Sequence, residues 1–315
     1  MIDAPTIFRS VSGTNKYVRE PIKMIWSNPR MNRLNQTVLL LVLAVSAGAH
    51  AEYFVNEVDR LHYEITGHGP AIILVGGGGG MDARQWEFVA PGLAASHQVI
   101  KFEPRGVGKS DNPTVKYSDT ADLNMLLDHL QLDRVTLIGV SSAGGFALEF
   151  AIQYPDRVAR VVAAAPFVPG FEFSQSMMTR LDEFNQAAQQ GRDLFLDKMF
   201  ADPHFIPAPL DRTVRNLARE IMADQFDKGD EFDATLALPL QPPLIEQLAA
   251  IRTPVLLLAG ELDHSEVLRR NRFLAAEIRS AEEKIIPNAG HNGQLENPGV
   301  FQSAMKSFLP GVAPH

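Results

Sequence analysis

Short apolar runs alternate with segments of helical period over most of the chain. The apolar runs are "AIILVGG" (71–77), "HQVIKFEP" (97–104), "RVTLIGV" (134–140), "RVARVVAAAP" (157–166), "PVLLLAGELD" (254–263) and "EEKIIPNAG" (282–290). Such runs suit strands that are buried on both faces. Helical spacing follows in residues 83–96, 119–132, 144–154, 266–279 and 299–309. This alternation predicts an α/β fold with a mainly parallel central sheet and helices on both faces.

The alternation stops between residues 167 and 247. That stretch contains two helix-like pieces, 174–190 and 210–224, is rich in Phe and Met, and has no convincing strand. We therefore expect a helical cap at 167–247, inserted between a first core part at 52–166 and a second at 248–315.

Residues 31–51 have the three parts of a secretory signal peptide. "MNRLNQ" carries Arg33, "TVLLLVLAVSAGA" is apolar, and Ala49-His50-Ala51 fits an A-x-A cleavage site. The apolar run is shorter than the roughly 20 residues that cross a bilayer, although an uncleaved anchor is the alternative. Residues 1–30 precede this signal and are interpreted as an upstream extension or a mis-called start. The protein is expected to be exported, periplasmic or secreted.

Charge and cysteine content exclude several functions. The 315-residue chain has a net charge of −8, and without residues 1–51 it would have −12. An acidic chain without a basic tract argues against nucleic acid as a partner, and disfavours anionic substrates unless the cleft is locally positive. The absence of Cys excludes disulfides, thiolate metal sites and a Cys nucleophile.

Two adjacent serines in "LIGVSSAGG" lie where a predicted strand meets a predicted helix. In a nucleophile elbow, the positions two before and two after the serine must be small. Ser141 has Gly139 and Ala143 at these positions, whereas Ser142 has the β-branched Val140 before it. Sterics therefore favour Ser141. The alternative is a structural turn in which both serines cap helix amides.

The chain resembles the α/β-hydrolase family, in the branch with a helical cap. "YPDRV" follows the turn with its proline fourteen positions after Ser141, and "VIKFEPRGVGKSDNP", "PVLLLAGELDH" and "NAGHNGQLENP" are similar to other family segments. The departures are Ala143 in place of Gly and Glu103 in place of Asp. The resemblance spans roughly residues 53–166 and 248–310 and implies an acid and a histidine in the last two segments.

A serine hydroxyl needs a base to become a nucleophile, and the base needs an orienting group. Asp263 ends a predicted strand, and His291 lies 28 residues further on, in the chain order Ser, Asp, His that accompanies this fold. His264 is a rival base and Glu261 a rival acid, but we interpret them as a rim residue and a turn residue.

An acyl-transfer site also needs two N–H donors for the oxyanion. One is the amide of Ser142. The resemblance implies that the other is Gly78, in the run of five glycines after the first apolar run. Trp86 is expected to pack this loop or to line the cleft. A plain flexible loop is the alternative.

Two phosphate-binding motifs compete with this interpretation. "GVGKS" at 106–110 lacks the first glycine of a phosphate loop, because residue 103 is Glu. Gly78-x-Gly80-x-x-Ala83, with Glu103 twenty residues after Ala83, fits a loose dinucleotide-binding fingerprint, but it leaves Ser141, Asp263 and His291 unexplained. A binding protein that lost catalysis is a further alternative.

The prediction is an exported serine hydrolase that cleaves a small, apolar ester by acyl transfer. Phe171 and Phe173 are expected to contact the substrate from the cap. No cofactor and no metal is expected, and the partner is a small-molecule substrate. The sequence leaves open the substrate, the oligomeric state, and amide or peptide, carbon–carbon bond and perhydrolase chemistry with the same three residues.

Overall fold

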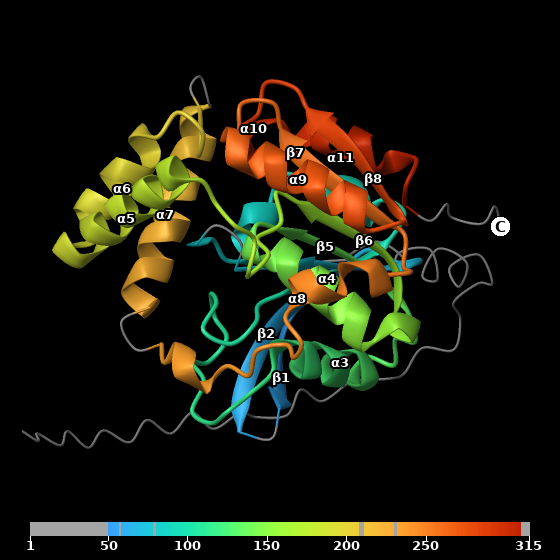
Figure 1. Cartoon of the computed structure of the whole chain (residues 1–315). Coiled ribbons are helices and arrows are strands. Elements are labelled where there is room, and N and C mark those ends of the chain that lie inside the picture. The colour runs from blue at the N-terminus through green and yellow to red at the C-terminus, as the bar shows by residue number, and fades with distance from the viewer. Residues whose placement is uncertain (1–49, 57, 78–79, 208–210, 230–231, 310–315) are drawn as a thin grey trace, which may run out of the picture. The chain divides into compact units, whose positions relative to one another are not determined.

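The computed structural model describes residues 50–56, 58–77, 80–207, 211–229 and 232–309, which lie in one compact unit. Their centre is an eight-stranded sheet (Figure 1). Its strands are β1 (His50–Asn56), β2 (Asp59–Thr66), β3 (Ala71–Val75), β4 (Gln98–Phe102), β5 (Val135–Val140), β6 (Val158–Ala164), β7 (Val255–Gly260) and β8 (Ala281–Ile286).

The sheet has the order β1-β2-β4-β3-β5-β6-β7-β8. β2 pairs antiparallel with β1 and with β4, and all other pairs are parallel. Because strands β3 to β8 run parallel, their carboxyl ends lie at one edge of the sheet. In open α/β sheets this edge is where ligands bind.

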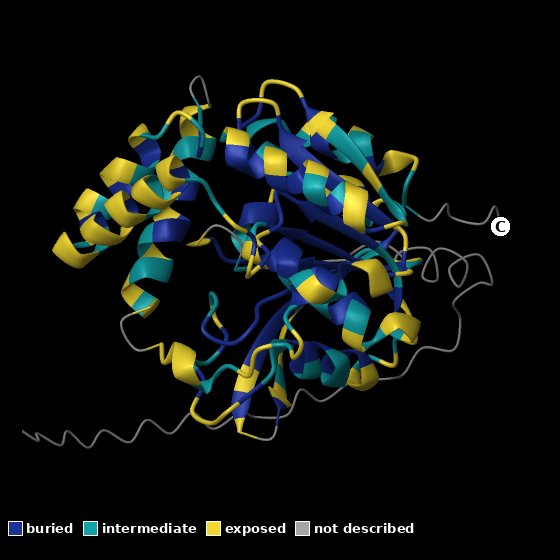
Figure 2. Cartoon of the chain, in the orientation of Figure 1, coloured by how far each residue is buried: buried dark blue, intermediate teal, exposed yellow. Residues whose placement is uncertain are grey.

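Successive residues of the central strands enter different cores. Ile73 and Val75 belong to one buried cluster, and Ile72 and Leu74 belong to the other. The first cluster is covered by α3 (Asp119–His129), α4 (Ser142–Gln153), α8 (Leu244–Gln247) and α9 (Ser265–Glu277), and the second by α2 (Ala90–Ala94) and α11 (Pro298–Lys306). Figure 2 shows the central strands in the colour of buried residues. This two-sided burial explains the uninterrupted apolar runs.

Three helices between β6 and β7 form a group of their own (Figure 1). They are α5 (Gln175–Gln190), α6 (Arg192–Ala201) and α7 (Arg212–Gly229). A third buried cluster contains Leu196 of α6, Ile221 of α7, and Met81 and Leu295 of the sheet domain. These helices correspond to the helical segment expected at 167–247. The end of that segment differs, because Leu244 of α8 packs in the sheet's own core.

The six apolar runs of the sequence correspond to strands β3 to β8, and the predicted α/β class is confirmed. The β1–β2 hairpin was not predicted as strands. The predicted extension (1–30) and most of the predicted signal (31–51) lie outside the described residues. β1 begins at His50, so it includes the last two residues of the predicted signal. In the part of the chain that the structure describes, no helix has the length and apolarity needed to cross a membrane.

Candidate active site

The chain turns sharply from β5 into α4 at Ser141. This residue has φ 54° and ψ −120°, a conformation that costs a non-glycine residue roughly 1–3 kcal/mol and needs fixed surroundings. Its N–H donates to the carbonyl of Ala164 (2.8 Å), and its carbonyl accepts from the N–H of Gly145 (3.0 Å). Backbone hydrogen bonds on both sides therefore hold Ser141 at the carboxyl edge of the sheet.

Close packing explains why glycine stands at 139 and why alanine is accepted at 143. A Cβ on Gly139 would lie 2.3 Å from the carbonyl oxygen of Ala143 and 2.8 Å from the nitrogen of Gly144. The side chain of Ala143 belongs to the buried cluster on one face of the sheet. The extra methyl group at 143 is thus accommodated in the core.

Ser142 has different surroundings, since it is the first residue of α4. The first N–H groups of a helix have no partner within the helix, so the amide of Ser142 is available to a ligand. Its Oγ donates to the carbonyl of Gly77 (3.1 Å). This hydrogen bond ties the start of α4 to the loop after β3.

Asp263 and His291 form a hydrogen-bonded pair. His291 Nδ1 lies 2.9 Å from Asp263 Oδ2, and Asp263 Oδ1 accepts from the N–H of His264 (2.7 Å). The approach of the two loops requires Gly260, because a Cβ there would lie 2.0 Å from the carbonyl oxygen of Gly290. A carboxylate at Nδ1 favours the tautomer that has its N–H there, in which Nε2 is the acceptor.

The loop that carries His291 is held by Glu296. Its Oε2 accepts from the N–H of Gly290 (2.7 Å), and its Oε1 accepts from the N–H of Asn292 (2.9 Å). Burial raises the pKa of Glu296 to about 7, although these two hydrogen bonds oppose the shift. His291 also donates its own N–H to the carbonyl of His204 (2.9 Å). These hydrogen bonds therefore hold the backbone at His291 and on both sides of it.

A cavity of about 280 Å³ at this edge is lined by Ser141, Asp263 and His291. The rest of its wall is mostly apolar and includes Phe173, Met177, Phe184, Phe195, Met199 and Met222. Among the described residues, no hydrogen bond joins Ser141 Oγ to His291. Such contacts are often long in sites without substrate and shorten when it binds.

The loop after β3 lies beside the turn at Ser141. The N–H of Gly77 donates to the carbonyl of Met81 (2.7 Å), and Gly77 has φ 99°, which favours glycine. Gly78, the predicted second oxyanion donor, lies outside the described residues. Trp86 does not line the cavity: it is fully buried, and its Nε1 donates to the carbonyl of Val75 (3.0 Å). It packs the base of the loop.

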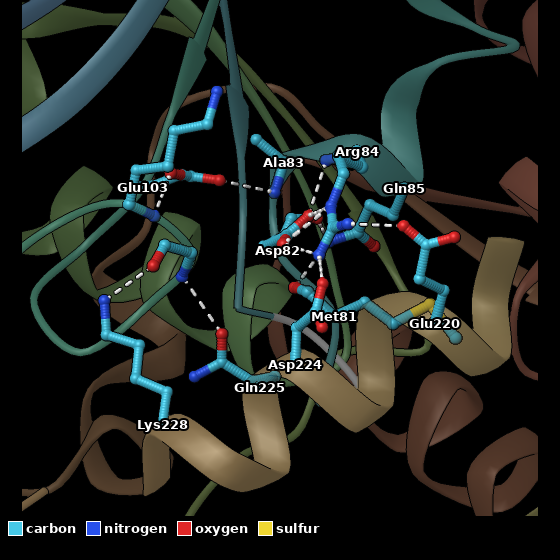
Figure 3. A network of polar contacts seen from close by, with 12 residues as sticks. Met81, Asp82, Ala83, Arg84, Gln85, Glu103, Glu220, Asp224, Gln225 and Lys228 are labelled. Carbon is cyan, nitrogen blue, oxygen red and sulfur yellow. Dashed lines mark hydrogen bonds and ion pairs between the residues drawn. The ribbon is translucent and has the colours of Figure 1, made fainter. Parts of the chain in front are cut away.

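Glu103 is fully occupied with structural contacts (Figure 3). It is 3 % exposed, and it accepts from the N–H of Ala83 (3.1 Å) and of Lys109 (2.8 Å) and lies 2.9 Å from His62 Nδ1. Burial alone would raise its pKa, but these hydrogen bonds lower the pKa below its usual value. The carboxylate is thus not available to a ribose, which removes the acidic group from the dinucleotide alternative.

The other predicted site residues are divided between the cavity and its support. Phe173 lines the cavity. Phe171 does not, since it packs edge-on against Phe173 (5.4 Å between ring centroids). The rival base His264 accepts from the N–H of Glu266 and caps α9. The rival acid Glu261 is exposed and accepts from the N–H of Asn288 (3.1 Å).

Sequence reasoning missed three charged residues at this site. Arg180 of α5 and Arg270 of α9 line the cavity, and Glu296 supports the loop of His291. No motif marks the two arginines, because α5 and α9 have an ordinary amphipathic pattern. The position of Glu296, five residues after His291, was the only available signal.

The described residues include no group of three or more His, Cys, Asp or Glu side chains that could hold a metal ion. Besides the two arginines, the polar residues that line the cavity are Ser141, His291 and Asp263, of which the last two are hydrogen-bonded to each other. Their arrangement matches a hydroxyl, a base and an orienting acid, in the same chain order as in the α/β-hydrolase fold.

Comparisons with known proteins point to the same fold. The family model described as alpha/beta hydrolase fold matches residues 70–298. A 2-hydroxy-6-oxononadienedioate/2-hydroxy-6-oxononatrienedioate hydrolase of Pseudomonas putida is 29% identical over 274 residues, which are 81% of this chain and 93% of that protein.

Solved structures agree. A thermophilic esterase from Thermogutta terrifontis has a TM-score of 0.68 at 22% identity and covers 83% of this chain and 98% of its own. The carboxylesterase CesB of Bacillus subtilis has a TM-score of 0.67 at 22% identity and covers 89% of this chain and 98% of its own.

Proposed function

Since the chain belongs to the alpha/beta hydrolase fold family and is a hydrolase, we propose that it cleaves small, apolar esters by acyl transfer through Ser141, His291 and Asp263. The observation that carries this proposal is the pair of Asp263 and His291, 2.9 Å apart, in one cavity with a serine at a strained turn. If these residues only packed the core or capped helices, they would not need to line the same cavity.

The proposed mechanism follows from the roles assigned to these three residues. Ser141 Oγ attacks the ester carbonyl while its proton passes to His291 Nε2, and Asp263 stabilises the imidazolium that forms. The tetrahedral intermediate collapses, and the leaving alcohol takes the proton from Nε2. Water then attacks the acyl-enzyme with His291 as base, and the acid is released as Ser141 recovers its proton.

The amides of Ser142 and Gly78 are proposed to bind the oxyanion. Loss of one such donor typically costs about 3–4 kcal/mol of transition-state stabilisation. The hydrogen bond from Ser142 Oγ to the carbonyl of Gly77 supports this role, because it holds the loop after β3 against the start of α4.

The apolar cavity wall supports an apolar acyl or alcohol group. α5, α6 and α7 supply much of that wall, so we assign to them the role of a cap that sets specificity.

The test is hydrolysis of 4-nitrophenyl esters of graded acyl length, with the matched anilides to separate ester from amide cleavage. Ser141→Ala is expected to lower kcat/KM by about 10⁴-fold or more. Ser142→Ala keeps its amide and is expected to stay within about tenfold of the unmodified protein. An active Ser141→Ala protein beside an inactive Ser142→Ala protein would overturn the assignment.

We also propose that the protein is exported and that residues 31–51 are removed. The support is the order of charged, apolar and small residues in that segment. Amino-terminal sequencing of protein recovered outside the cytoplasm should begin at Glu52. A chain that retains its apolar run would instead indicate an uncleaved anchor.

A further inference from the structure

Arg270 is a buried cation in the wall of the active-site cavity. It is only 2 % exposed, yet it lines the same cavity as Ser141 and His291. Its Nη2 donates to the carbonyl of Ala165 (3.0 Å), and this is the only hydrogen bond that its guanidinium makes with the described residues. Its Nε is buried and has no hydrogen-bond partner there.

The carboxylates near Arg270 are engaged elsewhere. Asp263 accepts from His291 and from the backbone of His264. Glu266 accepts from the N–H of Ser174 (2.9 Å) and pairs with Arg269 (2.8 Å). Within the described residues, Arg270 therefore has no carboxylate in direct contact, although a buried charge is costly unless it is paired.

Burial lowers the pKa of Arg270 to about 10, although the nearby charges of Asp263 and Glu266 oppose this shift. The guanidinium remains protonated at neutral pH. It carries into the apolar cavity a positive charge that hydrogen bonds within the protein leave largely unsatisfied.

Aromatic packing fixes the position of this charge. The guanidinium lies over the rings of Phe167 (6.0 Å) and Phe173 (5.5 Å). It is held on the β6–β7 side of Ser141, whereas the loop after β3 lies on the other side, because β5 separates β3 from β6 in the sheet. A substrate whose carbonyl meets that loop can extend from Ser141 toward Arg270.

The second arginine in the cavity differs, since its charge is matched. Arg180 Nε donates to Asp202 Oδ2 (2.7 Å), and its guanidinium lies over the ring of Phe184 (4.8 Å). Of the two guanidinium groups in the cavity wall, that of Arg270 thus has no anionic partner in direct contact among the described residues.

Resting on the serine hydrolase function proposed above, we propose that Arg270 is the carboxylate-binding residue of the substrate pocket. The preferred substrate is then an ester with a compact apolar body and one free carboxylate, which forms a charge-assisted hydrogen bond with the guanidinium. The negative net charge of the chain does not oppose this, because Arg270 places a positive charge without a direct ion pair to the described residues in the cavity wall.

The experiment compares acid esters with neutral esters of the same length. One pair is mono-(4-nitrophenyl) adipate and 4-nitrophenyl hexanoate, with the carboxylate on the acyl part. The other is 4-(hexanoyloxy)benzoate and its methyl ester, with the carboxylate on the alcohol part. In at least one pair, we expect kcat/KM to favour the acid ester by at least about tenfold.

Arg270→Met should abolish that preference, lowering kcat/KM for the acid ester at least about tenfold more than for the neutral ester, since only the acid ester loses a charged partner. Arg270→Lys should keep part of the preference. The matched control is Arg272→Met, which removes an exposed arginine of the same helix and should change neither ester.

The outcomes separate this inference from the function on which it rests. If no ester is turned over in a Ser141-dependent manner, the proposed function fails. If neutral esters are turned over and neither acid ester is preferred by the unmodified protein, only the carboxylate site fails. It also fails if Arg270→Met lowers acid and neutral esters equally, because Arg270 would then act through Asp263 or through the fold.

Discussion

At the scale of single residues, the turn at Ser141 depends on Gly139. An added Cβ would lie 2.3 Å from the carbonyl oxygen of Ala143, which is a backbone atom and cannot rotate away as a side chain could. We expect Gly139→Ala to move the turn and to lower kcat by about 10²-fold or more, as small misplacements of a nucleophile do. Ester turnover and the melting temperature measure this.

Ala143→Gly is the matched control for that change. It removes one methyl group on the other side of the turn, where the side chain of Ala143 packs in the core. Turnover should stay within about threefold, with a stability loss of roughly 1 kcal/mol. If Gly139→Ala were as active as Ala143→Gly, Ser141 would not be held by close packing.

Glu296 illustrates a residue that acts through its neighbour. Glu296→Gln keeps one acceptor and turns an NH₂ group toward the second backbone N–H, so one of the two hydrogen bonds that hold the loop of His291 is lost. We expect kcat to fall about tenfold with KM little changed, because the loop positions the base. Steady-state kinetics on a neutral ester measures both constants.

Glu261→Gln serves as the comparison, and it also tests the rival acid. Glu261 is exposed, whereas Asp263 is the residue that accepts the hydrogen bond from His291 Nδ1. Its kcat should remain within about twofold. A large loss in Glu261→Gln, together with a small loss in Glu296→Gln, would contradict the support assigned to Glu296.

The residues that sequence could identify are those with a required local pattern. Ser141 is marked by small neighbours, and Asp263 and His291 by the ends of apolar runs. Arg270 has no such mark, because its role depends on which side of α9 meets the cavity and on where Phe167 and Phe173 pack. Tertiary packing decides these points, and spacing along the chain does not.

At the scale of elements, the sequence pattern predicts strands β3 to β8 but does not predict the hairpin of β1 and β2. The central strands are buried on both faces and read as continuous apolar runs. β2 contains Arg60, His62 and Glu64 between apolar residues, and β1 forms the edge of the sheet. Such a strand has a weak signal, because polar residues interrupt its apolar pattern even where, as at His62, they are buried.

The attachment of α7 to the loop after β4 could not be predicted from the sequence either, since side chains of α7 bind backbone groups of that loop (Figure 3). Gln225 Nε2 donates to the carbonyl of Gly106 (2.6 Å), and its Oε1 accepts from the N–H of Gly108 (3.0 Å). Lys228 Nζ donates to the carbonyls of Gly108 (2.6 Å) and Ser110. Side chains of α7 thus hold the loop after β4.

Gln225→Ala should loosen this attachment. It leaves a backbone donor and an acceptor at 106–108 without a partner, which costs roughly 1–3 kcal/mol. We expect amides in residues 212–229 to exchange with deuterium at least about tenfold faster, while β5 to β7 are unchanged. Hydrogen exchange with peptide resolution measures both regions.

Arg219→Ala provides the matched control on the same helix. Arg219 pairs with Asp197 (2.6 Å) at an exposed position, and such pairs contribute only about 0–1 kcal/mol. Its effect on exchange should be much smaller. Equal exchange in Gln225→Ala and the unmodified protein would show that the apolar cluster alone holds α7.

At the scale of the whole molecule, two half-buried carboxylates, those of Asp119 and Glu296, oppose folding when they are ionised. Asp119 and Glu296 each have a pKa raised to about 7, and burial is the largest cause in both. For Asp119 the charge of Asp122 adds to the shift, and Arg105 opposes it. Its Oδ1 is buried without a hydrogen-bond partner among the described residues.

These raised values set the sign of the pH dependence. Between about pH 4 and pH 7, the folded chain holds protons at both sites that the unfolded chain has released, so the free energy of unfolding falls as pH rises through this window. Above about pH 7 both states are ionised at these sites and the contribution is constant. One such proton corresponds to a slope of about 1.4 kcal/mol per pH unit.

Asp119→Asn removes one of these groups and should flatten the slope. The difference in unfolding free energy between the variant and the unmodified protein should grow by about 1–3 kcal/mol from pH 5 to pH 8 in favour of the variant, because Asn cannot ionise. The slope should not vanish, since Glu296 titrates in the same window.

Urea unfolding at pH 5, 6, 7 and 8 measures the difference, and Asp133→Asn, at an exposed loop position, is the control. If both variants keep the slope of the unmodified protein, Asp119 ionises normally in the folded state, and the charge of Arg105 must offset its burial in full.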